Sequence, residues 1–183
     1  MTEDHAIAAA THALQNSGIV VARTDTIYGL LAKASDEAAV ERVYDTKGRT
    51  ENKACIILVK DPADIPFNQD VIAAILSESN RPTSIIVPVS GAPGWLTRGG
   101  DTLAYRILPP GHILCDIIDE TGPLIAPSAN PEGLPPAINI NQAKSYFGDK
   151  VNVYLDGGEV PTDVIPSRII KIRSDNTYET IRD

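Results

Sequence analysis

The sequence predicts an α/β protein whose core is a mixed, twisted sheet with flanking helices. Helix-like periodicity alternates with short β-branched runs along most of the chain. In two places, however, one predicted strand follows another without an intervening helix, at 84–89 and 102–108 and again at 167–173 and 177–182. Alternation favours parallel pairing and direct succession favours antiparallel pairing, so the sheet should contain both. The length of 183 residues fits one domain over residues 1–183.

The first predicted elements are a helix, a strand and a loop. Residues 4–16 are rich in alanine with apolar side chains on one face, and Gly18 is a typical helix stop. The apolar run 19–22 predicts a buried strand. Residues 23–30 are polar and then interrupted by a glycine, which predicts a loop at the carboxyl end of that strand.

A second helix and a second strand follow. Ser35 is a suitable N-cap for a helix over 36–47, and Gly48 closes that helix. The apolar run 55–59 predicts a strand. Asn68 can cap the next helix, which has an apolar stripe.

The second half of the chain continues the same alternation. A loop over 90–101 contains Trp95, which we interpret as an anchor for the loop. The remaining predicted elements are a helix at 112–120, a strand at 124–126, a helix at 141–147 and a strand at 151–155.

Composition and charge exclude several classes of protein. The net charge of −8 argues against a general polyanion binder, because phosphate contacts need clustered Lys and Arg. Cys55 and Cys115 lie in apolar runs and are typical of small buried side chains in a reducing compartment. We find no signal peptide and no apolar run of membrane-spanning length, so we expect a cytoplasmic protein with no membrane partner.

Common catalytic motifs are absent from the sequence. It contains neither a G-x-x-x-x-G-K-[ST] loop nor a G-x-G-x-x-G fingerprint. Ser128 lacks the flanking glycines of a nucleophile elbow. The three histidines offer no paired spacing for a metal.

Four short segments carry polar or cationic residues at the predicted ends of elements. They are T-D-T-I-Y-G-L at 24–30, K-G-R at 47–49, L-A-Y-R-I at 103–107 and S-A-N at 128–130. Taken singly, each has a simple structural reading. A helix C-terminus favours cations, and Ser and Asn are common turn residues. A lone arginine among apolar neighbours must either reach water or meet a partner, and the sequence leaves both open.

Taken in order, these segments resemble the YrdC-like family, the threonylcarbamoyl-AMP synthases. The family pattern runs P-T-[DE]-T-x-Y-G-L, K-x-R, P-G-P-x-T, V-R-x-P, S-x-N and a late P-S, and the resemblance extends from about residue 18 to 167. It implies a twisted sheet around a concave, positively lined cavity, in the short, single-domain form of the family. The sequence departs from the pattern at several places, among them Arg23 in place of proline and Ser84 in place of threonine.

The resemblance also implies a reaction and its partners. The family converts L-threonine, bicarbonate and ATP into threonylcarbamoyl-AMP and pyrophosphate. A downstream tRNA threonylcarbamoyl transferase complex then uses the adenylate to make threonylcarbamoyladenosine, and weak contact with tRNA is compatible with this role. Mg²⁺ would bind through the ATP phosphates, with no metal ligand from the protein.

Roles for individual residues follow from the same resemblance. Lys47 and Arg49 would be catalytic, because adenylyl transfer mainly needs stabilisation of phosphate charge. The implied nucleotide-binding residues are Lys47, Arg49, Ser84, Arg106, Ser128, Asn130 and Ser167. The implied threonine-binding residues are Thr24, Thr26 and Tyr28.

Two other functions stay open at this point. A non-catalytic module that binds double-stranded RNA or tRNA could use the same concave scaffold. A relative that handles another carbamoylated or adenylylated small molecule is a narrower option. The acidity of the chain and the lack of a long basic stripe favour the enzyme over the RNA-binding module.

Overall fold

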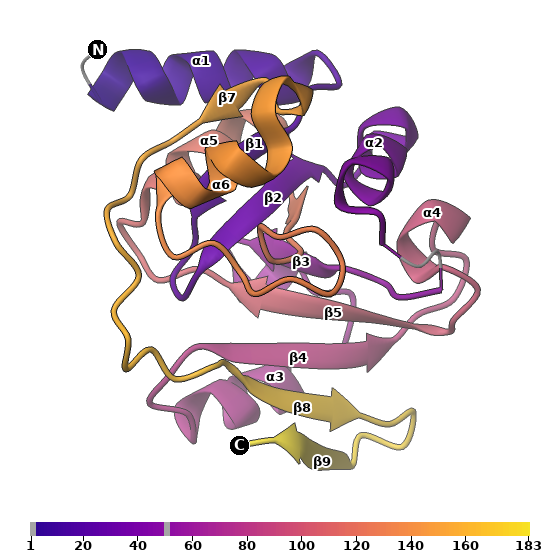
Figure 1. Ribbon diagram of the computed structural model, residues 1–183. Coiled ribbons are helices and arrows are strands. Elements are labelled where there is room, and N and C mark those ends of the chain that lie inside the picture. Colours follow the sequence, from indigo (N-terminus) through magenta and orange to yellow (C-terminus); the bar gives the residue numbers. More distant parts are fainter. Residues whose placement is uncertain (1–2, 50–51) are drawn as a thin grey trace.

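The computed structural model describes residues 3–49 and 52–183. Nine strands from these residues form one sheet in the order β7-β1-β2-β6-β3-β5-β4-β8-β9 (Figure 1). The strands are β1 (Val20–Arg23), β2 (Tyr28–Lys33), β3 (Ile56–Val59), β4 (Thr83–Pro88), β5 (Thr102–Ile107), β6 (Leu124–Ile125), β7 (Val153–Tyr154), β8 (Arg168–Ile172) and β9 (Tyr178–Arg182). The helices are α1 (Glu3–Gln15), α2 (Glu37–Lys47), α3 (Gln69–Ser77), α4 (Gly94–Thr97), α5 (Ile113–Thr121) and α6 (Ile140–Phe147), with single 3₁₀ turns at Pro62–Asp64 and Gly148–Lys150.

The sheet is mixed, which confirms the predicted fold class. β1 pairs with β2 antiparallel and with β7 parallel. In the other half of the sheet, β5 pairs with β3 parallel and with β4 antiparallel, and β8 pairs with β4 parallel. Long connections cross between the halves, and these connections bring distant parts of the sequence to the same edge.

Helices cover both faces of the central strands. Val20 and Ala22 of β1 pack in one apolar cluster with Leu14 of α1 and Leu114 of α5. Val21 of β1 and Ile19, just before it, belong to a second cluster, which includes side chains of α2, α3 and α6. Because successive strand residues point to opposite faces, a strand covered on both sides is apolar throughout. This explains the continuous apolar run of β1.

The prediction of a loop over 23–30 is wrong for its second half. Tyr28–Lys33 forms β2, and only residues 24–27 make the turn of an antiparallel hairpin with β1. The turn closes with a bond from the backbone N–H of Thr24 to the oxygen of Ile27, at 2.9 Å. Gly29 lies inside β2. A side chain at this position would crowd its neighbours, since a Cβ there would come within 3.2 Å of the Thr24 side chain. The glycine therefore marks a close approach and not the end of a strand.

The start of α2 also differs from the prediction. Its N-cap is Asp36 and not Ser35, since Oδ1 of Asp36 accepts the backbone N–H of Ala39 at 3.1 Å. A carboxylate is as good a cap as a hydroxyl, so the sequence offered two adjacent candidates. The predicted cap of α3 at Asn68 is confirmed. The predicted loop 90–101 contains the short helix α4, where Trp95 donates to the oxygen of Ala34 at 3.1 Å.

Other predictions concern the cysteines and the membrane. Cys55 and Cys115 are free and buried, as predicted. No helix within 3–49 or 52–183 combines the length and the apolar character needed to cross a membrane.

Candidate functional site

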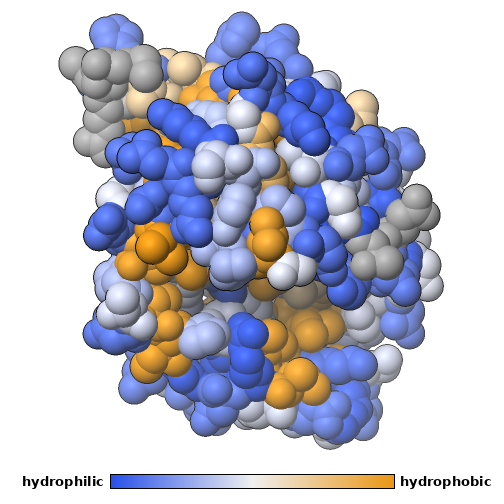
Figure 2. All heavy atoms as spheres, viewed as in Figure 1, coloured by the Kyte–Doolittle hydropathy of each residue, from blue (hydrophilic) through white to orange (hydrophobic). Residues whose placement is uncertain are grey.

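A cavity of about 480 Å³ opens where the hairpin turn, β3, β5 and the loop after β6 meet. This volume is within the usual range for small-molecule pockets. Figure 2 shows that the face viewed in Figure 1 is hollowed near its centre and that hydrophobic side chains border the hollow. The cavity is lined by three arginines, Arg49, Arg106 and Arg182, and by no carboxylate among the described residues. On a chain of net charge −8, this lining favours an anionic ligand.

Arg106 is the centre of one group of polar side chains. The register of β4 and β5 sets Ser84 directly opposite Arg106. The Ser84 hydroxyl accepts from Nε of Arg106 at 3.1 Å and from Nη2 at 3.0 Å. Nη2 also donates to the Ser167 hydroxyl, and Nη1 donates to Oγ1 of Thr26 at 3.0 Å. Three hydroxyls from three separate segments therefore converge on one guanidinium.

An ion pair stabilises the charge of Arg106. The residue is only 7% exposed, and burial lowers its pKa, while Asp25 opposes that shift. Oδ1 of Asp25 lies 3.3 Å from Nη1 of Arg106, and the Asp25 side chain is itself almost fully buried. The sequence left open whether this arginine reaches water or meets a partner. The structure shows that it meets partners.

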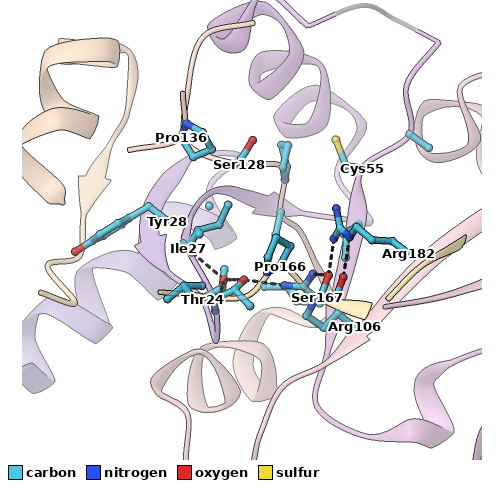
Figure 3. Close-up of a pocket in the computed structure, with 18 of the residues that line it drawn as sticks. Thr24, Ile27, Tyr28, Cys55, Arg106, Ser128, Pro136, Pro166, Ser167 and Arg182 are labelled. Atoms are coloured by element: carbon cyan, nitrogen blue, oxygen red, sulfur yellow. Dashed lines mark hydrogen bonds between the residues drawn. The ribbon is translucent and has the colours of Figure 1, made fainter. Parts of the chain in front are cut away.

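Arg182 joins this group, and the sequence did not predict it. Its Nε donates to the backbone oxygen of Ser167 at 2.9 Å, and its Nη2 donates to the Ser167 hydroxyl at 3.1 Å. Figure 3 shows Arg106 and Arg182 both directed at Ser167. Pairing the last two predicted strands as a hairpin would have brought the end of the chain close to Ser167.

Lys47 is the centre of a second group. Its Nζ donates to the backbone oxygens of Ser128 and Asn130 at 2.7 and 2.6 Å and to Oδ1 of Asn130 at 2.9 Å. The ammonium has three hydrogens, so these three oxygens satisfy it. Lys47 is only 2% exposed, and burial, with a smaller contribution from Arg49, lowers its pKa to about 8.

The end of α2 directs Arg49 towards the cavity. Gly48 has a left-handed backbone with φ of 62°, a conformation that glycine adopts without strain. The chain leaves the helix there, and the backbone N–H of Arg49 donates to the oxygen of Tyr44 at 3.0 Å. The Arg49 side chain then lines the cavity.

The loop 127–130 is fastened to β2. The oxygen of Pro127 accepts from the N–H of Leu30 at 2.9 Å, and the N–H of Ala129 donates to the oxygen of Tyr28 at 2.8 Å. Within the loop, the Ser128 hydroxyl donates to Oδ1 of Asn130 at 2.6 Å. Ser128 lines the cavity, as Arg49 does, whereas Asn130 is not among the lining residues.

The three residues predicted to bind threonine differ in their orientation. Thr26 faces Arg106, as described above, and Oγ1 of Thr24 donates to the oxygen of Ile27 at 2.8 Å. The Tyr28 ring is directed away from Arg106 and Ser167 (Figure 3). Its hydroxyl donates to the oxygen of Gly158 at 2.7 Å and accepts from the N–H of Gly157 at 3.0 Å. The phenol thus fastens a neighbouring segment, and burial raises its pKa.

The two groups border the same cavity, so the structure brings the predicted site residues together. Seven of them line the cavity: Thr24, Thr26, Tyr28, Arg49, Arg106, Ser128 and Ser167. Lys47, Ser84 and Asn130 lie in the layer behind and hold lining residues in place. Among the residues described, no group of three or more His, Cys, Asp or Glu side chains could hold a metal ion.

The fold and the cavity define an α/β protein with an arginine-lined pocket of the size that small molecules occupy. A family model named Sua5/YciO/YrdC, with the description "telomere recombination", matches residues 12–183. The chain belongs to the Sua5/YciO/YrdC family, as the sequence motifs predicted.

Relatives with curated names agree with this assignment. A threonylcarbamoyl-AMP synthase of Coxiella burnetii is 29% identical over 181 residues, which cover 94% of each chain. One of Idiomarina loihiensis is 30% identical over 170 residues, covering 85% of this chain and 90% of the relative. These names bear out the predicted enzyme type, a nucleotidyltransferase.

Solved structures show the same fold. Pyrococcus abyssi Sua5 in complex with L-threonine matches with a TM-score of 0.83 and 28% identity over 94% of this chain. The chain spans about half of that protein, 52% of its length. Escherichia coli YciO, at 18% identity, matches over the whole chain with a TM-score of 0.82, which supports the fold alone.

Proposed function

We propose that this protein is a threonylcarbamoyl-AMP synthase, which makes threonylcarbamoyl-AMP and pyrophosphate from L-threonine, bicarbonate and ATP. The observation that carries the proposal is that three arginines line one cavity of an acidic protein, two of which, Arg49 and Arg106, fall on motifs shared with the family. The similarity to Pyrococcus abyssi Sua5, which has been solved with L-threonine, supports the amino-acid substrate.

The proposed chemistry needs charge stabilisation more than covalent catalysis. The amine of L-threonine and bicarbonate combine to a carbamate with loss of water. A carbamate oxygen then attacks the α-phosphorus of ATP, and pyrophosphate leaves with the electron pair of the broken P–O bond. Holding the two anions in line and neutralising the phosphate oxygens is the contribution required of the protein.

Arg49 and Ser128 are the proposed contacts to the triphosphate, because both line the cavity and both fall on the K-x-R and S-x-N motifs. A guanidinium can contact two phosphate oxygens at once. Lys47 and Asn130 act from behind by fixing the loop that carries Ser128. Mg²⁺ would enter with the triphosphate and supply further charge neutralisation, since the lining has no carboxylate among the described residues to bind it independently.

The resemblance assigns Ser84, Arg106 and Ser167 to the nucleotide; because Arg106 also contacts Thr26, which the resemblance assigns to L-threonine, we propose that this group meets the carbamate or carboxylate of L-threonine where it adjoins the nucleotide. The Ser167 hydroxyl oxygen accepts from both Arg106 and Arg182, so its own hydrogen can donate either to the Ser84 hydroxyl, 3.4 Å away, or to a ligand. The Thr26 and Ser84 hydroxyls also accept from Arg106. A hydroxyl polarised by a guanidinium is a strong donor to an anion. Thr24 and Tyr28 shape this end of the cavity through the turn and the Gly157–Gly158 contact.

The test is pyrophosphate release from ATP by the purified protein, with L-threonine and bicarbonate present together and omitted in turn. We expect release that requires both, together with a product of the mass of threonylcarbamoyl-AMP. Release without L-threonine would indicate another substrate. Salt-sensitive binding of tRNA without any release of pyrophosphate would instead identify a non-catalytic RNA-binding module. If the protein is an active enzyme, the same tRNA-binding measurement shows whether it also contacts tRNA.

A further inference from the structure

The backbone oxygen of Lys53 accepts from two side chains, one on α2 and one just after the end of that helix. The Tyr44 hydroxyl donates to it at 2.7 Å, and Nε of Arg49 donates to it at 3.0 Å. Nη2 of Arg49 also donates to the oxygen of Ala54 at 3.2 Å. These two carbonyls fix the plane of the Arg49 guanidinium, and the side chain lines the cavity.

Tyr44 is held on several sides. It lies on α2, is only 4% exposed, and accepts the thiol hydrogen of Cys55 at 3.3 Å. The guanidinium carbon of Arg98 lies 3.7 Å from the centre of the Tyr44 ring, and that of Arg49 lies 6.0 Å from it. Burial raises the pKa of Tyr44, so the hydroxyl stays protonated and remains a donor.

Arg98 has features that packing alone does not explain. It closes α4 with a left-handed backbone, φ 53°, which is uncommon for a residue other than glycine. Its side chain is 9% exposed and pairs with Glu41 at 2.9 Å. Its Nε and Nη2 have no hydrogen-bond partner among the described residues. The cation–π contact with Tyr44 is therefore, beside the Glu41 ion pair, the main interaction of this guanidinium among the described residues.

We propose that Tyr44 and Arg98 are positioning residues that orient Arg49 towards the phosphates. Arg98 fixes the Tyr44 ring, the Tyr44 hydroxyl fixes the Lys53 carbonyl, and that carbonyl fixes Nε of Arg49. The inference rests on the proposed function, in which Arg49 contacts ATP. Neither residue lines the cavity.

The test compares Tyr44→Phe with Tyr154→Phe. Each change removes one hydroxyl that donates to a backbone oxygen at 2.7 Å, but Tyr154 lies outside the cavity lining. For Tyr44→Phe we expect KM and Kd for ATP to rise about three- to tenfold, as for the loss of one ordered hydrogen bond, with KM for L-threonine unchanged. Tyr154→Phe should leave KM and Kd for ATP unchanged.

Arg98→Met should weaken ATP binding as Tyr44→Phe does. Arg98→Lys keeps a cation over the Tyr44 ring and should lose less ATP affinity than Arg98→Met.

A double-variant cycle separates positioning from a general loss of structure. In an Arg49→Lys background, Tyr44→Phe should change the ATP affinity by less than about twofold, because the group it positions is gone. An equal effect of Tyr44→Phe in both backgrounds, or no difference from Tyr154→Phe, would overturn the proposal. ATP affinity is measured by calorimetry without turnover. If the wild-type protein binds ATP but releases no pyrophosphate, the proposed function fails while the cycle still decides the positioning role.

Discussion

The Nζ atom of Lys47 lies 2.6 Å from the backbone oxygen of Asn130, although 83 positions separate the two residues. The same ammonium holds Oδ1 of Asn130 and the oxygen of Ser128. It therefore joins the end of α2 to the loop 127–130 in the layer behind the cavity. Lys47 therefore has a structural role in addition to the role in catalysis proposed for it.

Replacing Lys47 by methionine should reduce both stability and turnover. The sequence alone predicts that Lys47→Ala or Arg49→Ala leaves folding intact, but the burial of Lys47 changes that expectation for the lysine. Methionine fills the space and leaves buried oxygens unpaired, which costs about 1–3 kcal/mol. We expect turnover to fall by a factor on the order of 10². Urea unfolding and pyrophosphate release measure the two effects, and an unchanged unfolding midpoint would contradict the first.

Arg49→Ala should reduce turnover without a comparable loss of stability. Arg49 is partly exposed and lines the cavity, so its removal leaves a solvated space. We expect turnover to fall by a factor on the order of 10² if the guanidinium stabilises the transferring phosphate charge. Arg173→Ala is the matched control, since Arg173 is exposed and paired with Glu179 outside the cavity lining. Near-normal turnover of Arg49→Ala would remove Arg49 from the proposed mechanism.

The lowered pKa of Lys47 predicts opposite effects of pH on activity and stability. Turnover should decline as pH rises through about 8, because the neutral amine loses one donor and its charge. Between about pH 8 and 10.5, the unfolded chain keeps the Lys47 proton that the folded chain has released. The contribution of Lys47 to the free energy of unfolding therefore rises with pH in this window.

Comparison with Lys47→Met isolates that contribution. The difference in unfolding free energy, wild type minus variant, should increase from pH 8 to 10.5, whereas other titrating groups cancel between the two proteins. A difference that stays flat across this range would mean that Lys47 keeps its ordinary pKa in the folded protein.

The positions of Lys47 and Asn130 could be predicted from motif order, but the contact of Arg182 could not. The two last strands were both expected, and their hairpin follows from their proximity in sequence. However, the pairing shifts between Ile169 and Ile170, so that Arg182 stands opposite Ile169. Since a shift of one residue reverses the face of every side chain, this irregularity decides that Arg182 and not Ile181 meets Ser167. Nothing in the sequence around residues 169–170 or 180–182 specifies this shift in strand pairing.

The same kind of limit applies to Gly29. A glycine after polar residues is typical of a loop, and the sequence alone favours that interpretation. A Cβ at position 29 would lie 3.2 Å from the side chains of both Thr24 and Leu31, and the contact with Thr24 exists only once the chain has folded back into the hairpin. Local patterns thus gave the elements, while tertiary contacts determined which residues form the wall of the cavity.

Arg106→Met should be one of the more destabilising single changes in the site. It leaves the buried carboxylate of Asp25 without its ion-pair partner, which typically costs about 3–5 kcal/mol. The double variant Asp25→Asn with Arg106→Met removes both charges and should recover a large part of that loss. Urea unfolding of the four proteins measures the coupling. A double variant no more stable than Arg106→Met alone would show that the ion pair is not the source of the effect.

Gly157→Ala should loosen the segment that leads to the cavity. A Cβ at 157 would lie 2.6 Å from Cβ of Arg23, far inside van der Waals contact. The same segment is bound by Arg23, whose Nη1 donates to the oxygens of Gly157 and Glu159 at 3.0 Å each. We expect a loss of about 1–3 kcal/mol in unfolding free energy, as for other overpacked sites. KM for L-threonine should rise as well, because the segment continues to Ser167.

The clashing atom makes this prediction specific. Arg23→Ala keeps Cβ and should not rescue Gly157→Ala, whereas Arg23→Gly removes the atom and should restore much of the lost stability, apart from the flexibility that a new glycine adds to the unfolded chain. Gly94→Ala is the control, since a Cβ there meets no atom within 4 Å. Rescue by Arg23→Ala would contradict this explanation. It would mean that position 157 requires glycine because of the Arg23 guanidinium and its hydrogen bonds, and not because the two backbones lie close together.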